Sequence, residues 1–287
     1  MPLHPQRVYM LAADHRWQWE EFCDQRSLPR ERIRDVKRLA RDGFVLARER
    51  SAAVREFGAL LIDEQYSAAV IADALKAGLN VGTPAEKAGA VPLAWAADPF
   101  PAALTGAFVK VLARYRPDDD AAVLAEQWLK LEALQAWCRG AGKPLVLEVL
   151  VARKGEAEEP FEISGRPAML AEFIAEAYRR ALTPEFWKIE GTLAPEGART
   201  IDAAIAAHPS CRQIILGKAA DLSTIDRWFA ACAASATASG FAIGRSVFWE
   251  PSAAYLCGTK TADQAAAAVC DNYLALVQAW DSSRIQN

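Results

Sequence analysis

Short apolar runs alternate with longer segments of mixed polarity along almost the whole chain. An apolar run of about four to eight residues that ends in polar residues is typical of a strand buried on both faces. Apolar positions that recur about every 3.6 residues are typical of a helix that covers such a strand. The expected strands lie at 8–13, 58–62, 79–83 or 91–96, 107–112, 143–150, 186–192, 212–218 and 240–245.

Segments with a helical period follow most of these runs. The sequence predicts a loop or short helix at 17–23, and helices at 30–41 and 43–57 with a break at Gly43. The polar segment 151–165 is expected to be a loop. Further helices are expected at 67–76, 118–138, 167–182, 195–207, 222–239 and 261–280.

Strand and helix therefore alternate about eight times, and no linker rich in proline, glycine or serine interrupts them. This order predicts a parallel sheet with crossover helices. Eight repeats over 287 residues favour a single α/β domain, residues 1–287, folded as a closed (β/α)8 TIM barrel. The alternative is an open doubly wound sheet. A dinucleotide-binding sheet has a glycine-rich loop after its first strand, whereas the turn at 13–17 has no glycine.

Composition and charge narrow the classes of function. The net charge of −3 at pH 7 indicates no general attraction to nucleic acid or to an anionic membrane. No apolar run approaches the roughly 20 residues of a membrane-spanning helix, and residues 1–9 lack the apolar core of a signal peptide. Six scattered cysteines suit reduced thiols in the cytoplasm. With three histidines, neither a zinc site nor another cofactor is expected, although carboxylates could still hold magnesium.

Several of the expected strands contain or end in an ionisable residue. In a barrel the C-terminal ends of the strands converge on one site. Isolated buried charges cost several kcal/mol each, so these charges are expected to compensate one another in an active-site cluster rather than in scattered structural ion pairs. The residues concerned are Asp14, Asp63 with Glu64, Lys110, Glu148, Lys188 with Glu190, Lys218 and Arg245.

Lys188 lies in the middle of the apolar run 186–192. Alternation along a strand places it on one face with Phe186 and Glu190. A lysine held in a low-dielectric site loses its proton more readily, and the neutral amine is a nucleophile toward carbonyl carbons. We therefore expect Lys188 to form a Schiff base with a ketone; the alternative is a lysine that simply pairs with a carboxylate. Lys110, equally deep in its strand, would favour the neutral amine of Lys188 or orient the substrate.

The last two strands suggest a phosphate site. Barrels often bind phosphate with the loops after these strands. Glycine lets the backbone approach the phosphate, and a basic side chain neutralises it. Arg245, with Gly244 and Ser246, is the first candidate, and Gly217 with Lys218 is the second. The alternative for Lys218 is an exposed loop lysine.

These residues together resemble those of a known enzyme family. The segments that carry the resemblance are 10–16, 63–66, 145–148, 188–190 and 244–245. They are similar to class I barrel aldolases of the tagatose-bisphosphate aldolase type. The opening Asp14-His15-Arg16-Trp17-Gln18 looks closer to one branch, the 5-dehydro-2-deoxyphosphogluconate aldolase domain that is fused to a kinase in inositol catabolism.

The resemblance implies roles for individual residues. Lys188 would be the Schiff-base lysine and Glu148 the acid/base, with Lys110 and Asp14 as the fourth-strand lysine and the first-strand aspartate. The sequence departs from the family pattern at Gly191, where proline is frequent. It departs again at His15 and Trp17, where tagatose-type enzymes tend to have glutamine and glycine. These departures leave the substrate open.

The implied substrate is a sugar phosphate, 5-dehydro-2-deoxy-D-gluconate 6-phosphate, which is cleaved to dihydroxyacetone phosphate and malonate semialdehyde. Arg245 would hold the phosphate, and either Arg16 or Arg114 the carboxylate. Asp63, Gln65 and Glu190 are further candidates for substrate contacts. A homo-oligomer and a functional link to a sugar kinase are also expected.

Three other functions fit the same residues. The first is an aldolase for another substrate, such as tagatose bisphosphate or a sulfonated sugar phosphate. The second is an isomerase or epimerase that uses the carboxylates without an imine. The third is a non-catalytic barrel that binds a sugar phosphate and regulates a partner kinase.

Overall fold

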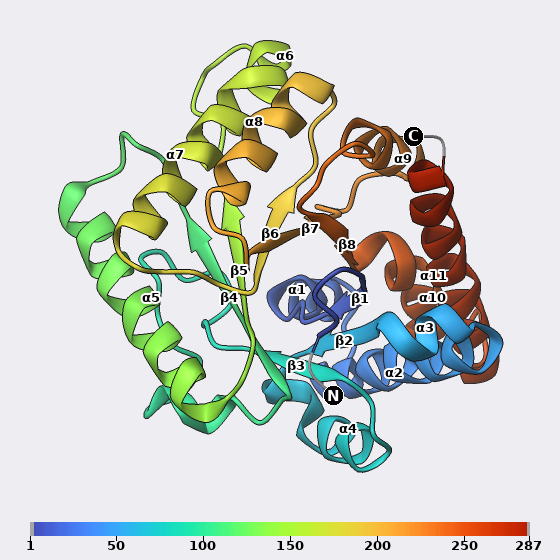
Figure 1. Cartoon of the computed structure of the whole chain (residues 1–287). Coiled ribbons are helices and arrows are strands. Elements are labelled where there is room, and N and C mark those ends of the chain that lie inside the picture. Colours follow the sequence, from blue (N-terminus) through green and yellow to red (C-terminus); the bar gives the residue numbers. More distant parts are fainter. Residues whose placement is uncertain (1–2, 286–287) are drawn as a thin grey trace.

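Eight parallel strands pair in sequence order and close into a barrel, because β1 pairs with both β2 and β8. The computed structural model describes residues 3–285 (Figure 1). The predicted (β/α)8 barrel is therefore confirmed. The strands are β1 Val8–Ala13, β2 Gly58–Ile62, β3 Val81–Pro84, β4 Phe108–Arg114, β5 Leu145–Leu150, β6 Phe186–Glu190, β7 Arg212–Leu216 and β8 Ala238–Ile243.

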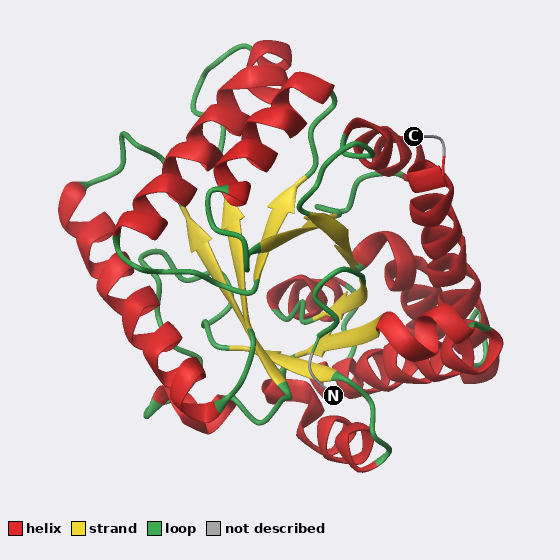
Figure 2. Cartoon of the chain, viewed as in Figure 1, coloured by secondary structure: helices red, strands yellow, loops and turns green. Residues whose placement is uncertain are grey.

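Helices other than α1 surround this barrel on the outside, as Figure 2 shows. None of those described between residues 3 and 285 is long and apolar enough to span a bilayer. The α-helices are α1 Trp17–Gln25, α2 Ile33–Arg50, α3 Ala52–Phe57, α4 Glu64–Lys76, α5 Ala121–Ala141, α6 Glu158–Pro160, α7 Arg166–Arg179, α8 Pro195–Ala206, α9 Leu222–Ala231, α10 Arg245–Leu256 and α11 Ala262–Ile285. Three further turns of helix are η1 Arg30–Arg32, η2 Phe100–Ala103 and the π-helical η3 Phe161–Gly165.

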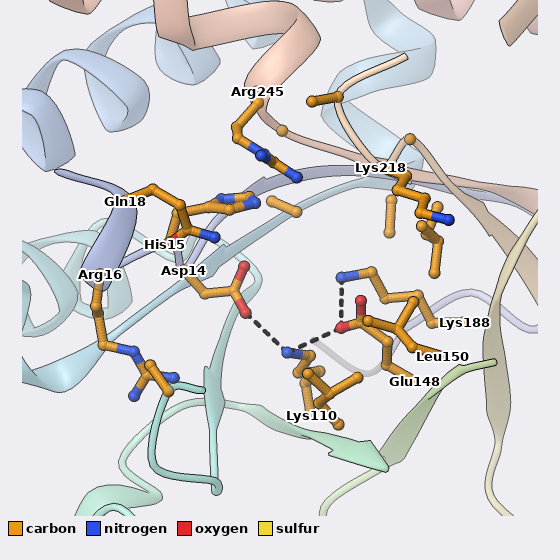
Figure 3. Close-up of a pocket in the computed structure, with 18 of the residues that line it drawn as sticks. Asp14, His15, Arg16, Gln18, Lys110, Glu148, Leu150, Lys188, Lys218 and Arg245 are labelled. Carbon is orange, nitrogen blue, oxygen red and sulfur yellow. Dashed lines mark hydrogen bonds and ion pairs between the residues drawn. The ribbon is translucent and has the colours of Figure 1, made fainter. Parts of the chain in front are cut away.

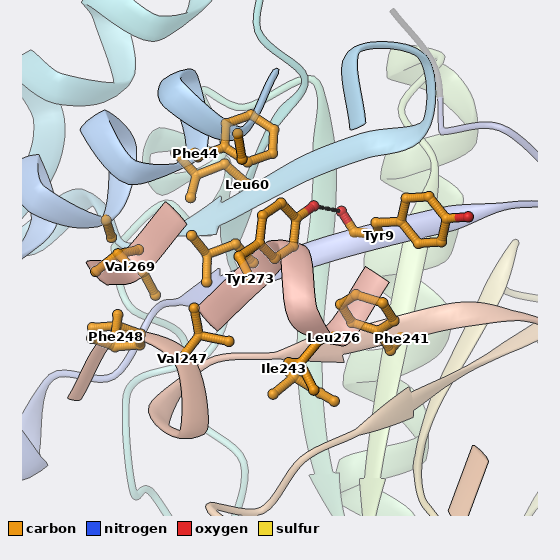
Figure 4. Close-up of a cluster of buried hydrophobic side chains, with 14 of the residues drawn as sticks. Tyr9, Phe44, Leu60, Phe241, Ile243, Val247, Phe248, Val269, Tyr273 and Leu276 are labelled. Atoms are coloured by element: carbon orange, nitrogen blue, oxygen red, sulfur yellow. Dashed lines mark hydrogen bonds between the residues drawn. The ribbon is translucent and has the colours of Figure 1, made fainter. Parts of the chain in front are cut away.

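Strand alternation separates an inner core from an outer core. The outward-facing side chains pack against the helices. In one region Tyr273 of α11 lies among apolar side chains of α2, β2, β8 and α10 (Figure 4). The Tyr273 hydroxyl donates a hydrogen bond of 2.6 Å to the backbone oxygen of Tyr9, which ties the last helix to the first strand.

The inner face of each strand changes character along its length. It carries buried apolar residues first: Phe108, Val146 and Phe186 near the N-terminal ends of β4, β5 and β6, and Ala12 further along β1. Two residues further along the same strands, on the same face, stand Asp14, Lys110, Glu148 and Lys188. The barrel is thus filled by apolar side chains below and lined by charged ones at its C-terminal mouth.

The expected break at Gly43 is wrong. Helix α2 runs through Gly43 and ends at Arg50, and the chain bends at Ser51, whose hydroxyl accepts a hydrogen bond from Val54 N. Gly43 is there because α11 packs closely on α2: a Cβ at this position would lie 2.5 Å from Val269 Cγ1. The glycine marks a helix–helix contact and not a helix end.

The segments around the last two strands also differ from expectation. Helix α9 ends at Ala231, and β8 begins at Ala238, two residues before the predicted start. Arg245 is the first residue of helix α10, which the sequence analysis did not predict. Pro251 lies inside α10 and weakens the helical signal of this segment. Of the two candidates for the third strand, 79–83 is the one that joins the barrel, and β3 spans Val81–Pro84.

Two glycine substitutions test the α2–α11 contact. Alanine normally stabilises a helix by about 1 kcal/mol relative to glycine. Gly43→Ala should nevertheless lower the free energy of unfolding by about 1–3 kcal/mol, because its Cβ overlaps Val269. Gly140→Ala in α5 is the control and should be stabilising, since nothing lies within 4 Å of its Cβ. Urea unfolding of both variants checks this, and an equal gain at the two positions would contradict the packing argument.

Candidate active site

A cavity of about 290 Å³ opens at the C-terminal mouth of the barrel. Its walls come from β1, β4, β5 and β6 and from the loops that follow β3, β7 and β8. Figure 3 shows most of the polar side chains that line it. These side chains are Asp14, His15, Arg16, Gln18, Glu86, Lys110, Arg114, Glu148, Lys188, Lys218 and Arg245.

One carboxylate oxygen is shared by two lysines at the centre of this cavity. Glu148 Oε2 lies 2.9 Å from Lys188 Nζ and 2.8 Å from Lys110 Nζ (Figure 3). Lys188 lies directly beside Glu148 in the β5–β6 register. Both lysines are almost fully buried, with 5% and 3% exposure for Lys188 and Lys110. The sequence prediction that these three residues come together therefore agrees with their positions.

Lys110 has two further carboxylate partners. Its Nζ lies 3.0 Å from Asp14 Oδ2 and 2.9 Å from Glu86 Oε1. Glu86 in turn accepts a hydrogen bond from Leu112 N and faces Arg16, whose Nη2 lies 3.6 Å away. Each buried charge in the group therefore has an opposite charge beside it, which is the condition for burying charges at acceptable cost.

These contacts set the protonation of the cluster. Burial alone would raise the pKa of Asp14, but the charges of Lys110 and Lys188 outweigh it and hold that pKa well below its usual value. The same two lysines lower the pKa of Glu148 against the effect of burial. Burial would lower the pKa of Lys110, but Asp14, Glu148 and Glu86 raise it well above its usual value. Lys110 is thus a permanent cation beside ionised carboxylates, which leaves Lys188 as the candidate nucleophile.

His15 contributes a neutral ring to the cavity wall. Burial, together with the charges of Arg245, Lys37 and Lys188, lowers its pKa to about 3 even though Asp14 opposes the shift. The ring lies 5.9 Å from that of Phe248, and its buried Nδ1 has no partner among the described residues. An imidazole in this state can donate one hydrogen bond and accept another at neutral pH.

The loops after β7 and β8 supply two cations. Arg245 extends into the cavity with no carboxylate partner among residues 3–285, and its buried Nε is unpaired there. Burial lowers the pKa of this guanidinium. Gly244 makes the turn possible, because a Cβ would lie 1.9 Å from the backbone oxygen of Ala12. Lys218 follows Gly217, is half exposed, and places its Nζ 2.7 Å from Glu190 Oε1.

Four predicted substrate contacts do not line this cavity, and that part of the expectation needs correction. Asp63 is fully buried in an ion pair with Lys37 and caps α4 by accepting from Tyr66 N. The other three have partners of their own: Gln65 donates to Glu20, Ser246 donates to the backbone oxygen of Ala220, and Glu190 pairs with Arg166 and Lys218.

The Lys37–Asp63 pair supports the site from below. Lys37 Nζ lies 2.5 Å from Asp63 Oδ2 and donates hydrogen bonds of 2.6 Å to the backbone oxygens of Ala13 and His15. It therefore fastens the turn that carries Asp14. Sequence reasoning missed Lys37, although its place between Val36 and Ala40 on the buried face of α2 was a usable signal.

Glu86 was also missed. It lies two residues after the short strand β3. An ionisable residue just after an apolar run, as at Asp14, is a usable signal, but this run was only one of two candidates for the third strand. Over the described residues, no group of three or more His, Cys, Asp and Glu side chains is placed to hold a metal ion.

The chain is similar to one family model and to solved barrel structures. A family model described as "Uncharacterized protein conserved in bacteria (DUF2090)" matches residues 3–284. No curated protein matches the chain. A solved structure of the Schiff base forming fructose-1,6-bisphosphate aldolase, from an analysis of reaction intermediates, has a TM-score of 0.55 and 16% identity, over 95% of this chain and 94% of that one. An archaeal fructose 1,6-bisphosphate aldolase has a TM-score of 0.58 and 14% identity, over 97% and 95%. These likenesses extend over the whole barrel.

Because His15 is held neutral in the folded chain, we expect the protein to be less stable in acid. In the unfolded chain a histidine takes up a proton near pH 6.5, whereas His15 in the folded chain does so only near pH 3. The free energy of unfolding should fall as the pH drops from 7 to 5, and His15 alone should account for about 2 kcal/mol of that fall. Asp14 and Glu148 add to the loss at lower pH, because their pKa values are depressed in the folded state.

Urea unfolding at several pH values measures this effect. His15→Gln cannot titrate, so its unfolding free energy should fall less between pH 7 and 5 than that of the wild type. The same slope in both proteins would show that His15 is not held neutral.

Proposed function

The chain belongs to the DUF2090 family, and we propose that it is a class I aldolase that cleaves a keto-sugar phosphate through a Schiff base on Lys188. The observation that carries the proposal is the pairing of the buried Lys188 amine with Glu148 inside the barrel mouth. The likeness to barrels that include a Schiff base forming aldolase adds support at the level of the fold.

The proposed reaction begins at Lys188 Nζ. Its proton has an acceptor at hand in Glu148 Oε2, 2.9 Å away. The free amine adds to the ketone carbon, and loss of water gives a protonated imine that accepts the electron pair of the breaking C–C bond. Glu148 removes the proton of the hydroxyl on the carbon that leaves as aldehyde. Protonation of the enamine and hydrolysis of the imine then release the second product and restore Lys188.

The neighbouring residues would support these steps. Lys110 keeps a positive charge beside Asp14 and Glu148, so both carboxylates stay ionised and able to accept protons. Asp14 would orient substrate hydroxyls. Arg245 would hold the phosphate at the end of β8, with Gly244 allowing the close approach and Lys218 with Gly217 completing that side of the cavity.

The charges of the cavity support an anionic substrate. Its lining has cationic side chains at six positions and carboxylates at only three, Asp14, Glu86 and Glu148, although the chain as a whole has a net charge of −3. The proposed substrate, 5-dehydro-2-deoxy-D-gluconate 6-phosphate, has both a phosphate and a carboxylate. On this proposal the enzyme acts in inositol catabolism in the cytoplasm and uses a substrate that a sugar kinase has phosphorylated. The enzyme would be a homo-oligomer. The structural likeness to fructose-1,6-bisphosphate aldolases favours a sugar bisphosphate as the second candidate.

Reductive trapping tests the Schiff base. Borohydride added with dihydroxyacetone phosphate should attach the triose phosphate irreversibly to Lys188, because the reduced imine cannot hydrolyse. Peptide mass spectrometry locates the label. Lys188→Met should remove it, together with at least about 10³-fold of the cleavage activity on the proposed keto-sugar phosphate.

Lys76→Met is the matched control, since Lys76 is an exposed lysine at the end of α4. It should leave both label and activity unchanged. No label in the wild type would exclude the imine and favour an isomerase, an epimerase or a non-catalytic barrel that only binds the sugar phosphate.

Glu148→Gln separates imine formation from bond cleavage. The amide cannot act as a base, so the cleavage rate should fall by about 10²- to 10⁴-fold while the label on Lys188 remains detectable. Glu56→Gln, an exposed glutamate of α3 at the other end of the barrel, is the control and should behave as wild type. Single-turnover kinetics measure the step, and an unchanged cleavage rate in Glu148→Gln would assign the base elsewhere.

A further inference from the structure

Two cations stand on opposite sides of the barrel mouth. Arg114 is the last residue of β4, and Arg245 follows β8 by two residues. In a closed barrel whose eight strands pair in sequence order, β4 and β8 are four strands apart in either direction, so they face each other across the mouth. Strand β6, which carries Lys188, lies midway between them on one side.

Arg114 shares the inward face of β4 with the reacting centre. Alternation places Phe108, Lys110, Leu112 and Arg114 in one row, and the last three of them line the cavity. Lys110 is therefore deep in the site and Arg114 is at its rim. A ligand that reaches Arg114 must pass the Lys110–Glu148–Lys188 cluster on its way from Arg245.

Arg114 is chemically available, whereas Arg16 is not. Arg16 is 6% exposed and lies beside Glu86, which also neutralises Lys110. Arg114 is exposed, and within residues 3–285 its side chain has neither an ion pair nor a hydrogen bond, while its backbone oxygen accepts a hydrogen bond from Gln127 Nε2. A guanidinium without a carboxylate partner beside a cavity can form a charge-assisted pair with a ligand anion.

There is also space at this end. A second hollow of about 230 Å³ adjoins the main cavity and shares Glu86, Gly89, Leu112 and Arg114 with it. The nearby acids are already engaged: Asp119 pairs with Lys154, and Asp120 caps α5. Lys87 and Arg114 are the cations that line this hollow, and of the two Arg114 also lines the main cavity, so it is the one placed to hold a negative group of a ligand bound at Lys188.

From this geometry we infer that Arg114 binds a second anionic group of the substrate, on the fragment that leaves as an aldehyde. The inference rests on the proposed aldolase function and deepens it. The substrate spans the mouth, with its phosphate at Arg245, its ketone carbon at Lys188, and a carboxylate or second phosphate at Arg114. The substrate class is thus an open-chain keto sugar that is anionic at both ends.

The synthetic direction tests this assignment. Dihydroxyacetone phosphate is condensed with malonate semialdehyde, glyceraldehyde 3-phosphate or the uncharged glyceraldehyde, and kcat/KM is measured for each aldehyde. The wild type should prefer an aldehyde with a negative charge, and whether carboxylate or phosphate is preferred identifies the group. Arg114→Gln should lower kcat/KM for the preferred anionic aldehyde roughly 10- to 100-fold and leave that for glyceraldehyde within about two-fold.

Two controls make the result specific. Arg227→Gln changes an exposed arginine of α9 and should have no effect on any aldehyde. Arg114→Lys keeps the charge and should restore part of the preference. Borohydride trapping of dihydroxyacetone phosphate does not involve the second anion, so Arg114→Gln should be labelled at Lys188 at the wild-type rate.

Some outcomes would overturn the inference. An Arg114→Gln protein that retains the preference for the anionic aldehyde, or that loses activity equally with glyceraldehyde, would show that Arg114 does not read the charge of the aldehyde. A wild type that neither traps dihydroxyacetone phosphate nor condenses it with any aldehyde would remove the proposed function, and the role of Arg114 with it. Normal trapping separates the first failure from the second.

Discussion

The shared oxygen of Glu148 is the contact on which the site depends. Two ammonium groups within hydrogen-bond distance of one point would repel each other strongly in a buried, low-dielectric environment. Glu148 Oε2 lies between Lys110 and Lys188 and makes their proximity possible. Asp14 and Glu86 add two further negative charges around Lys110, so that Glu148 is not committed to that lysine alone. The ammonium form of Lys188 can be buried here because the carboxylate of Glu148 balances its charge.

The fold supplies this contact by strand register and closure. Glu148 and Lys188 are direct neighbours across β5 and β6, and Glu148 lies opposite Leu112 of β4, two residues beyond Lys110. The apolar side chains one step lower on the same faces, such as Val146 and Phe186, exclude water from beneath the charges. Lys37 and Asp63 then fix the β1 turn, so that Asp14 meets Lys110. The closed parallel barrel brings the C-terminal ends of all four strands, β1, β4, β5 and β6, to one mouth.

The sequence predicted the clustering of Lys110, Glu148 and Lys188 better than the residues around them, for a physical reason. Lys110, Glu148 and Lys188 each interrupt an apolar strand, and such an interruption is visible locally. Asp63 stands at a strand end in the same way, but it caps α4 and pairs with Lys37, which lies on a helix far from it in the sequence. The residues next to Asp63 do not distinguish such a structural aspartate from one that binds substrate. The carboxylate of Glu86 lies beyond a strand of only four residues, Val81–Pro84, which gives a weak periodic signal. The fold class followed from the repeated alternation of strand and helix, which does not depend on any single boundary.

The cations of the cavity fall into two groups, those with a carboxylate partner and those without one. Four of the six, Arg16, Lys110, Lys188 and Lys218, have carboxylate partners, so they contribute little net charge and mainly fix geometry and protonation. Arg245 and Arg114 have no such partner among the described residues, and they stand at the ends of opposite strands. A field that is balanced at the centre and positive at both ends favours a ligand whose charge is likewise at its ends and whose middle is neutral. A keto sugar with terminal anions has that distribution, and its uncharged carbonyl would then lie beside Lys188, the proposed nucleophile.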